Sequence, residues 1–172
     1  MSIQLNPIGF VKTKFAGEEI RNQPVEELEA DIEILDEYAD GLETIDGFSH
    51  LLILSYMHNI TAENRKRLKI KPRIVVKYGL SLEEVSLVGV FCLDSPNRPN
   101  PICLSAVRLL WRKGKILHVK GIDALNETPV LGIKPYSPAR KIEKFEFTRM
   151  VQKHNSQSKS KRPQHSRLLN CL

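Results

Sequence analysis

The residues best suited to chemistry lie in a proline-rich stretch from Ser95 to Ser105, which reads Ser-Pro-Asn-Arg-Pro-Asn-Pro-Ile-Cys-Leu-Ser. Its prolines fix φ and remove backbone donors, so the stretch is predicted to be neither helix nor central strand. A stiff, extended loop of this kind would hold the polar side chains of Asn97, Arg98 and Asn100 ready for a ligand. A structural turn rich in proline is the other interpretation that composition allows.

A second polar cluster runs from Gly121 to Val130 and is followed by Ile133-Lys-Pro-Tyr136. Asp123, where a strand is expected to end, is followed closely by Asn-Glu-Thr-Pro, a combination typical of an Asx-type turn. A carboxylate in this place could accept hydrogen bonds from a ribose or an amine. A turn that binds no ligand is the alternative.

Several other chemistries find no support in the sequence. It contains no GxGxxG, GxxxxGK[ST], HExxH or GxSxG motif, so dinucleotide, P-loop and common hydrolase sites are not expected. His50 and His58 would share a strand face about 26 Å apart, too far to bind one metal. The three cysteines have no CxxC spacing. A metal-dependent mechanism is therefore not predicted.

The positive charge is concentrated at the C-terminus. From residue 139 onward the chain has nine Lys and Arg and two Asp and Glu, of the 26 and 20 in the whole chain. A cationic segment rich in Ser, Gln and Asn favours a polyanion such as RNA through phosphate neutralisation. A solvated tail without a partner is the alternative. The cations expected to contact RNA are Lys153, Lys159, Lys161, Arg162 and Arg167.

The general composition indicates a soluble cytoplasmic protein that does not bind a membrane. The longest apolar run, Leu51 to Leu54, is far too short to span a bilayer. The first residues lack the basic and apolar regions of a secretory signal. An odd number of cysteines also argues against a disulfide framework.

The pattern along the chain predicts a mainly β protein. The strand at residues 50–58 is apolar on both faces in its middle and should lie centrally. Six or seven strands with short connections favour a small antiparallel β-barrel. Strands are expected at residues 8–14, 31–35, 50–58, 74–78, 85–93, 106–112 and 116–122, with a loop at 15–25 and short helices at 37–45 and 143–152. We expect a barrel domain at residues 1–138 and a flexible basic extension at 139–172, partly helical and then of low complexity.

Five segments, in this order, resemble one family. They are Ile8-Gly9-Phe-Val, Gly47-Phe-Ser-His-Leu51, Arg98-Pro-Asn-Pro-Ile102 with Leu104-Ser105, Thr128-Pro-Val130 and Ile133-Lys-Pro-Tyr136. Together they resemble the TrmO family of S-adenosylmethionine-dependent tRNA methyltransferases over about residues 5–138. The resemblance implies methylation of the exocyclic nitrogen, N6, of threonylcarbamoyladenosine next to the anticodon. It also implies a β-barrel homodimer with the cofactor near the subunit interface.

The resemblance also assigns a cofactor site, although no single catalytic residue can be named. The implied contacts come from the loop before Pro24, the end of the central strand, the proline-rich loop and the acidic turn. They are Asn22, Gln23, His58, Asn59, Arg98, Asn100, Leu104, Asp123, Asn126 and Thr128.

Three positions depart from the family pattern. Asp94 replaces an arginine, and Asn126 and Gly132 each replace an aspartate. These changes leave a second interpretation open, in which the chain is a non-enzymatic member that binds S-adenosylmethionine or RNA without transferring a methyl group.

Overall fold

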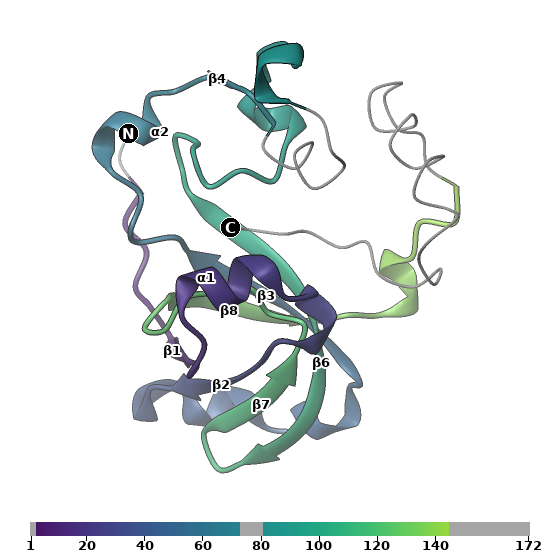
Figure 1. The fold of residues 1–172 in the computed structure, drawn as a ribbon. Coiled ribbons are helices and arrows are strands. Elements are labelled where there is room, and N and C mark those ends of the chain that lie inside the picture. Colours follow the sequence, from purple (N-terminus) through teal and green to yellow (C-terminus); the bar gives the residue numbers. More distant parts are fainter. Residues whose placement is uncertain (1–2, 73–80, 145–172) are drawn as a thin grey trace.

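The computed structural model describes residues 3–72 and 81–144. Six antiparallel strands close into a barrel in the order β1-β2-β7-β6-β3-β8 (Figure 1). The barrel strands are β1 (Gly9–Lys12), β2 (Glu29–Ile34), β3 (His50–Tyr56), β6 (Ile102–Lys113), β7 (Ile116–Lys120) and β8 (Pro129–Pro135). The predicted small antiparallel β-barrel is thus confirmed.

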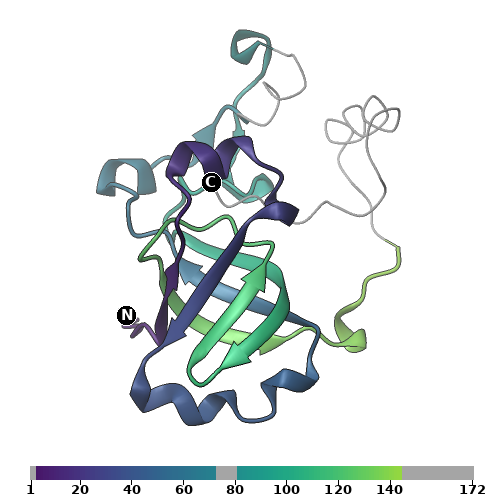
Figure 2. The same cartoon turned by 60° about the horizontal axis from the view of Figure 1, so that its bottom comes forward.

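Short helices and a two-stranded ribbon lie at the two ends of the barrel. At one end lie α1 and a lobe made of α2 and the ribbon β4-β5, while η2 and η3 lie at the other (Figure 2). The helices are α1 (Gly17–Asn22), α2 (Ala62–Arg65), η1 (Val25–Glu27), η2 (Asp36–Leu42), η3 (Ile45–Gly47), η5 (Leu82–Glu84), η6 (Val90–Cys92) and η7 (Pro138–Arg140), and the ribbon pairs β4 (Lys69–Ile70) with β5 (Val88–Gly89).

Strand β3 organises the barrel because it pairs with β6 on one side and with β8 on the other. Its residues alternate between buried and partly exposed, as expected for a strand with one face toward a core. The buried side chains meet those of the other strands inside the barrel. The core consists of Val11, Ala30, Ile32, Ile34, Leu42, Leu51, Ile53, Val107, Leu117, Val119, Ile122 and Val130.

The closure between β1 and β8 is short. Only Gly9 and Phe10 of β1 pair with Val130 and Pro129 of β8. The second half of β8 pairs with β3 on one edge, and no strand of the described chain pairs with its other edge. The barrel is consequently less tightly closed on this side.

The positions of several elements correct the sequence predictions. The stretch predicted to exclude a central strand contributes its last four residues to β6, where Ile102 pairs with Tyr56 and Ser105 with Ile53. The prolines all precede Ile102, so they leave this part of the ladder free to form. The predicted strand at 85–93 is also wrong, since it contains only the two residues of β5, followed by η6.

Two elements were missed in the sequence. Helix α1 lies within the predicted loop at 15–25, and the Glu19 side chain stabilises its start by accepting a hydrogen bond from Ala16 N at 2.7 Å. Strand β8, where no strand was predicted, has a proline at each of its ends. Both prolines are terminal, a position that a strand tolerates.

The remaining predictions concern residues that the structure does not describe. The predicted strand at 74–78 and most of the helix at 143–152 lie outside the described residues, as do the RNA-contacting candidates Lys153, Lys159, Lys161, Arg162 and Arg167. In the described parts of the chain, no helix is both long and apolar enough to cross a membrane.

Candidate functional site

A small pocket lies at the end of the barrel where β3 ends and β6 begins. Its volume is about 40 Å³. The residues that line it come from the end of β3, the start of β6 and the connection between β7 and β8. They are Ser55, Met57, His58, Asn59, Ile60, Cys103, Asp123, Ala124, Leu125 and Thr128.

Asp123 is the most deeply buried charged residue of the pocket, with 3% of its surface exposed. The chain turns into this position at Gly121, whose φ of 98° lies in the left-handed region that favours glycine. The N–H of Gly121 donates to the carbonyl of Leu28 at 2.8 Å, which anchors the turn on the barrel wall. This burial places the carboxylate in the wall of the pocket, where a bound ligand would meet it.

The turn that follows Asp123 is fastened to β1 by several bonds. Asn126 Oδ1 accepts a hydrogen bond from Thr13 N at 3.0 Å, and Glu127 N donates to the carbonyl of Val11 at 2.8 Å. Glu127 has a φ of 62° and also forms an ion pair with Lys12 at 2.7 Å. The expected turn is therefore present, and it holds Asp123 and Thr128 at the pocket.

His58 follows β3 directly and brings a second polar group to the pocket. Its Nδ1 atom is buried and has no hydrogen-bond partner among the residues described. A buried polar atom left without a partner is costly, and such exceptions often mark the place of a ligand or water. The adjacent Ile60 carbonyl accepts a hydrogen bond from Arg65 Nε at 3.2 Å, which ties the pocket rim to α2.

The arginine of the proline-rich loop, Arg98, donates hydrogen bonds to backbone carbonyls in and just before the same loop. Arg98 Nε donates to the Ser95 carbonyl at 2.8 Å, and its Nη2 donates to the carbonyl of Leu93. Burial raises the pKa of the Asp94 carboxyl, and the nearby Arg98 charge partly opposes this. In this structure the loop is therefore folded around Arg98 itself.

The structure brings together four of the ten predicted cofactor residues. His58, Asn59, Asp123 and Thr128 line the pocket, whereas Arg98 and Asn126 hold neighbouring loops in place. Leu104 points away from the barrel interior with 43% of its surface exposed. Asn22, at the end of α1, Gln23, which follows it, and Asn100 do not line the pocket.

Several pocket residues escaped the sequence analysis. Ser55 and Cys103 face each other across the β3–β6 pair and point inward. The strict alternation along both strands was the available signal for them. Within residues 3–72 and 81–144, no group of three or more His, Cys, Asp or Glu side chains is arranged to hold a metal ion.

The sequence and the fold are similar to those of known proteins. Residues 10–141 match the model of the tRNA-methyltransferase O N-terminal domain. An S-adenosyl-L-methionine-binding protein of Archaeoglobus fulgidus is 37% identical over 136 residues, 78% of this chain and 89% of that protein. A putative S-adenosylmethionine-dependent methyltransferase of Pseudomonas aeruginosa is 34% identical over 146 residues, 80% of this chain and 58% of that protein.

Two solved structures of TrmO are also similar to this chain. A crystal structure of TrmO aligns with a TM-score of 0.66 and 28% identity, over 87% of this chain and 64% of that one. The crystal structure of TrmO from Pseudomonas aeruginosa aligns with a TM-score of 0.64 and 29% identity, over 85% of this chain and 61% of that one. This chain thus spans less than two thirds of either solved protein. By the match of its residues 10–141, the chain belongs to the TrmO family.

Proposed function

We propose that this protein transfers a methyl group from S-adenosylmethionine to N6 of threonylcarbamoyladenosine next to the anticodon of tRNA. The observation that carries the proposal is a pocket, in a chain of the TrmO family, that holds the buried Asp123 and the Nδ1 atom of His58, which has no hydrogen-bond partner among the described residues. The names of its relatives, which are S-adenosylmethionine-binding proteins and a putative methyltransferase, support the choice of cofactor.

The residues of the pocket fit part of this cofactor. S-adenosylmethionine supplies an activated methyl group on a positively charged sulfur. The Asp123 carboxylate would accept hydrogen bonds from its ribose or amino group, and His58 Nδ1 offers a further polar contact. Apolar side chains such as Ala124 and Leu125 would cover its less polar parts. The main task of the protein is then to hold the methyl group in line with the target amine.

The volume of the pocket supports a homodimer. Pockets for ligands of this size usually measure about 300–1,000 Å³, whereas this one measures about 40 Å³. A single chain therefore encloses only part of the cofactor, and we propose that a second copy completes the site.

The surface that would meet this second copy lies on the lobe of α2, β4, β5 and η6. Leu68, Leu87 and Phe91 are exposed there by 59%, 59% and 79%. Val90 N donates a hydrogen bond to the Leu68 carbonyl at 3.1 Å. Leu68 and Phe91, which follows Val90, therefore lie on adjacent segments. The lobe stands at the pocket end of the barrel (Figure 1). Exposed apolar clusters of this kind are typical of protein interfaces.

Calorimetry with S-adenosylmethionine tests the cofactor site. We expect the wild-type protein to bind and Asp123→Asn to bind at least tenfold more weakly. Asp40→Asn, at the other end of the barrel, is the matched control and should bind normally. The absence of binding at millimolar ligand would refute every cofactor-dependent function, while normal binding by Asp123→Asn would refute the role of this carboxylate.

The substrate is tested with tRNA from a strain that lacks the gene. Nucleoside mass spectrometry should show threonylcarbamoyladenosine without its N6 methyl group, and wild-type protein should restore it in vitro. Cofactor binding together with a normal level of the methylated nucleoside would instead favour the non-enzymatic interpretation, which Asp94, Asn126 and Gly132 keep open.

The oligomeric state is tested by sedimentation. Phe91→Asp should dissociate the dimer and weaken cofactor binding by tenfold or more in the same protein. Ile142→Asp is the control, since Ile142 is 73% exposed and follows η7, outside the lobe. A wild-type monomer that binds the cofactor with full affinity would contradict the shared site.

The basic extension completes the proposal, in which residues 1–138 are the methyltransferase domain and residues 139–172 contact tRNA. The cations Lys153, Lys159, Lys161, Arg162 and Arg167 would neutralise phosphates. Deleting residues 153–172 should then weaken tRNA binding and reduce its dependence on salt. An unchanged salt slope would show that this segment makes no phosphate contact.

A further inference from the structure

A second and much larger cavity, of about 460 Å³, lies at the end of the barrel opposite the Asp123 pocket. Phe48, just before β3, and Pro135, at the end of β8, belong to this cavity, whereas Ser55 near the end of β3 belongs to the first. We call it the η2–η3 cavity, after the two short helices beside it (Figure 2). It is lined by Ile8, Ile34, Glu37, Tyr38, Gly41, Leu42, Glu43, Ile45, Phe48, Ile133 and Pro135.

The short pairing between β1 and β8 explains why space remains here. The last bond between the two segments here runs from Ile8 N to the Val130 carbonyl at 2.8 Å. Past this point Ile133 and Pro135 pair with β3 on one edge, and no strand among the described residues pairs with their other edge. The helices η2 and η3 cover this end only in part. An apolar wall next to an open strand edge is a usual place for a segment of protein to bind.

The backbone beside the cavity is also unusual. Thr44, which joins η2 to η3, has a φ of 64°. A branched side chain rarely adopts this left-handed conformation. Such strain is found preferentially where a structure binds something, so it supports a binding role for the cavity independently of its size.

The rim of the cavity is acidic. Residues 35–48 contain five Asp and Glu and no Lys or Arg. Arg112 and Lys115 form ion pairs with Asp46 and Asp36. Glu37, Asp40 and Glu43 form no ion pair with any described residue. The cavity therefore favours an occupant that combines apolar and basic side chains.

We propose that residues 145–152 of this chain bind in the η2–η3 cavity. Their sequence, Phe-Glu-Phe-Thr-Arg-Met-Val-Gln, has four large apolar side chains within eight residues. Lys144 and Arg149 lie beside or within it and match the acidic rim.

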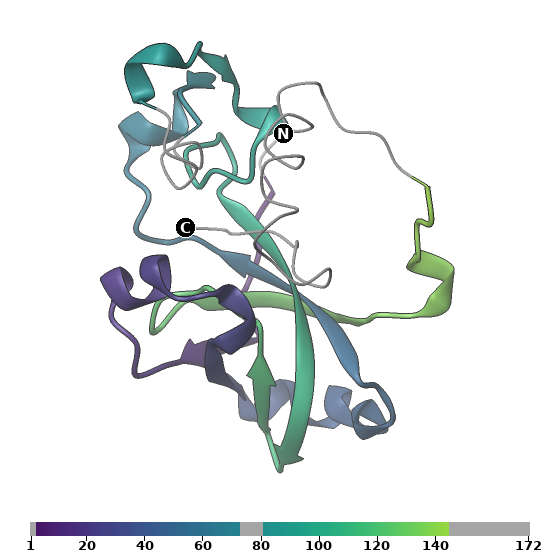
Figure 3. The ribbon, with the colours of Figure 1, turned by 45° about the vertical axis from the view of Figure 1, so that its right-hand side comes forward.

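The path of the chain makes this contact accessible. The chain leaves the barrel at Pro135, which is itself part of the cavity wall, and passes through η7 (Figure 3). Phe145 follows Pro135 by ten positions, so the proposed segment begins a short distance along the chain from the cavity wall. A tether of this length also gives a high effective concentration, which favours the contact within one chain.

Hydrogen–deuterium exchange of the full chain tests the proposal. In the double variant Phe145→Ser/Phe147→Ser, amides of residues 36–47 and 131–134 should exchange at least fivefold faster than in the wild type. Amides of β6 and β7 should keep their rates, which shows that the barrel stays folded. Lys159→Ala/Lys161→Ala is the matched control, because it alters the same extension beyond the proposed segment.

Two further measurements distinguish residues 145–152 of the same chain from a second copy of the protein as the segment bound in the cavity. Glu43→Lys should accelerate exchange at the cavity, whereas Glu18→Lys, an exposed acidic residue of α1, should not. The protection should persist on dilution and in the Phe91→Asp variant. Equal exchange in the wild type and the double variant would overturn the proposal. Protection that is lost on dilution would also overturn it, because the occupant would then be a second copy.

Discussion

The side-chain oxygen of Asn126 accepts a hydrogen bond from the backbone N–H of Thr13 at 3.0 Å. This bond joins residues more than one hundred positions apart in the sequence. It fixes the turn between Asp123 and Thr128 against the end of β1, so the geometry of the candidate cofactor pocket depends on it.

The bond predicts different effects for two substitutions. Asn126→Asp keeps an oxygen acceptor and should preserve both stability and S-adenosylmethionine affinity. Asn126→Ala removes the acceptor and should lower the free energy of unfolding by about 1 kcal/mol, with weaker cofactor binding because the turn loosens. Urea unfolding and calorimetry measure both effects. An equal loss in the two variants would show that the amide itself, rather than its oxygen, is required.

Gly9 is predicted to be intolerant of any side chain. A Cβ at this position would overlap the carbonyl oxygen of Glu33 and lie 2.9 Å from Ile34 Cδ1. Because the first of these is backbone, β1 and β2 would have to separate. Gly9→Ala should therefore lower the free energy of unfolding by about 2 kcal/mol or more.

The matched control for this prediction is Gly47→Ala, where a Cβ would meet nothing within 4 Å. Thermal unfolding of both variants should show a large decrease in Tm for Gly9→Ala alone. Similar decreases in the two would refute the steric explanation.

Asp94 gives a prediction about pH. Burial raises its pKa above the ordinary value of 3.8. The unfolded chain therefore loses this proton first as pH rises, so the free energy of unfolding decreases between 3.8 and the raised folded pKa. Asp94→Asn removes this titration. The variant should gain stability relative to the wild type over that interval and keep a constant advantage above it.

Urea unfolding between pH 3 and 7 measures this difference. Asn100→Ala, in the same proline-rich loop, has no titrating group and should follow the wild-type pH profile. If the difference between Asp94→Asn and the wild type does not change with pH, the carboxyl is not destabilised by its surroundings.

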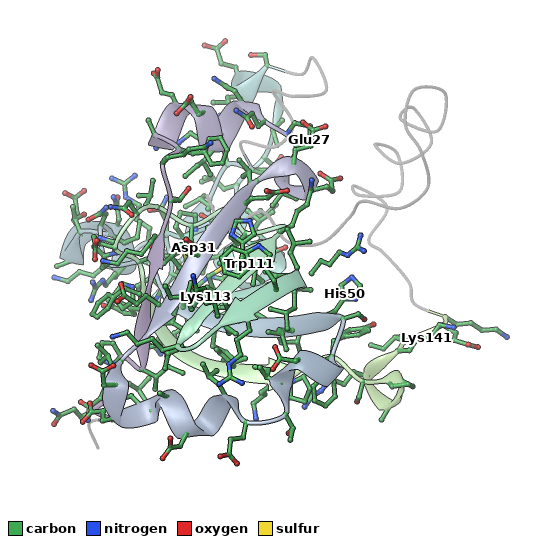
Figure 4. The ribbon with its side chains drawn as sticks, turned by 90° about the horizontal axis from the view of Figure 1, so that it is seen from below. Glu27, Asp31, His50, Trp111, Lys113 and Lys141 are labelled. Atoms are coloured by element: carbon green, nitrogen blue, oxygen red, sulfur yellow. The ribbon has the colours of Figure 1, made fainter. Side chains whose placement is uncertain are left out.

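His118 gives a prediction for the outer wall of the barrel. Its Nδ1 lies 2.6 Å from Asp31 Oδ1, and its ring stacks on Trp111 with centroids 4.6 Å apart. Asp31 in β2 and Trp111 in β6, both labelled in Figure 4, each pair with His118 in β7. His118→Ala should destabilise the protein by about 1–2 kcal/mol through loss of the hydrogen bond and the stacking.

The chain has one tryptophan, so fluorescence reports directly on this contact. The emission of Trp111 should change in His118→Ala and stay as in the wild type in His50→Ala. Unchanged emission and stability in His118→Ala would show that the stacking is not maintained in solution.

The sequence predicted the barrel because its strongest signals are local. Residues 50–58 show the apolar pattern of a central strand, and Lys113-Gly114-Lys115 marks the β6–β7 turn, where Gly114 has a φ of 59°. Side-chain alternation and glycine conformation depend on neighbours within a few residues. They can therefore be predicted from the sequence before the fold is known.

The composition of the site depended on the tertiary structure. His58 and Asp123 are 65 positions apart and line one pocket only because β3 and the connection after β7 end at the same side of the barrel. The sequence could not show that Leu104 points outward, since this depends on the register of β6 against β3. The η2–η3 cavity also arises from register, because β1 and β8 pair over only two residues. Long-range pairing decides these features, and local residue preferences carry no information about it.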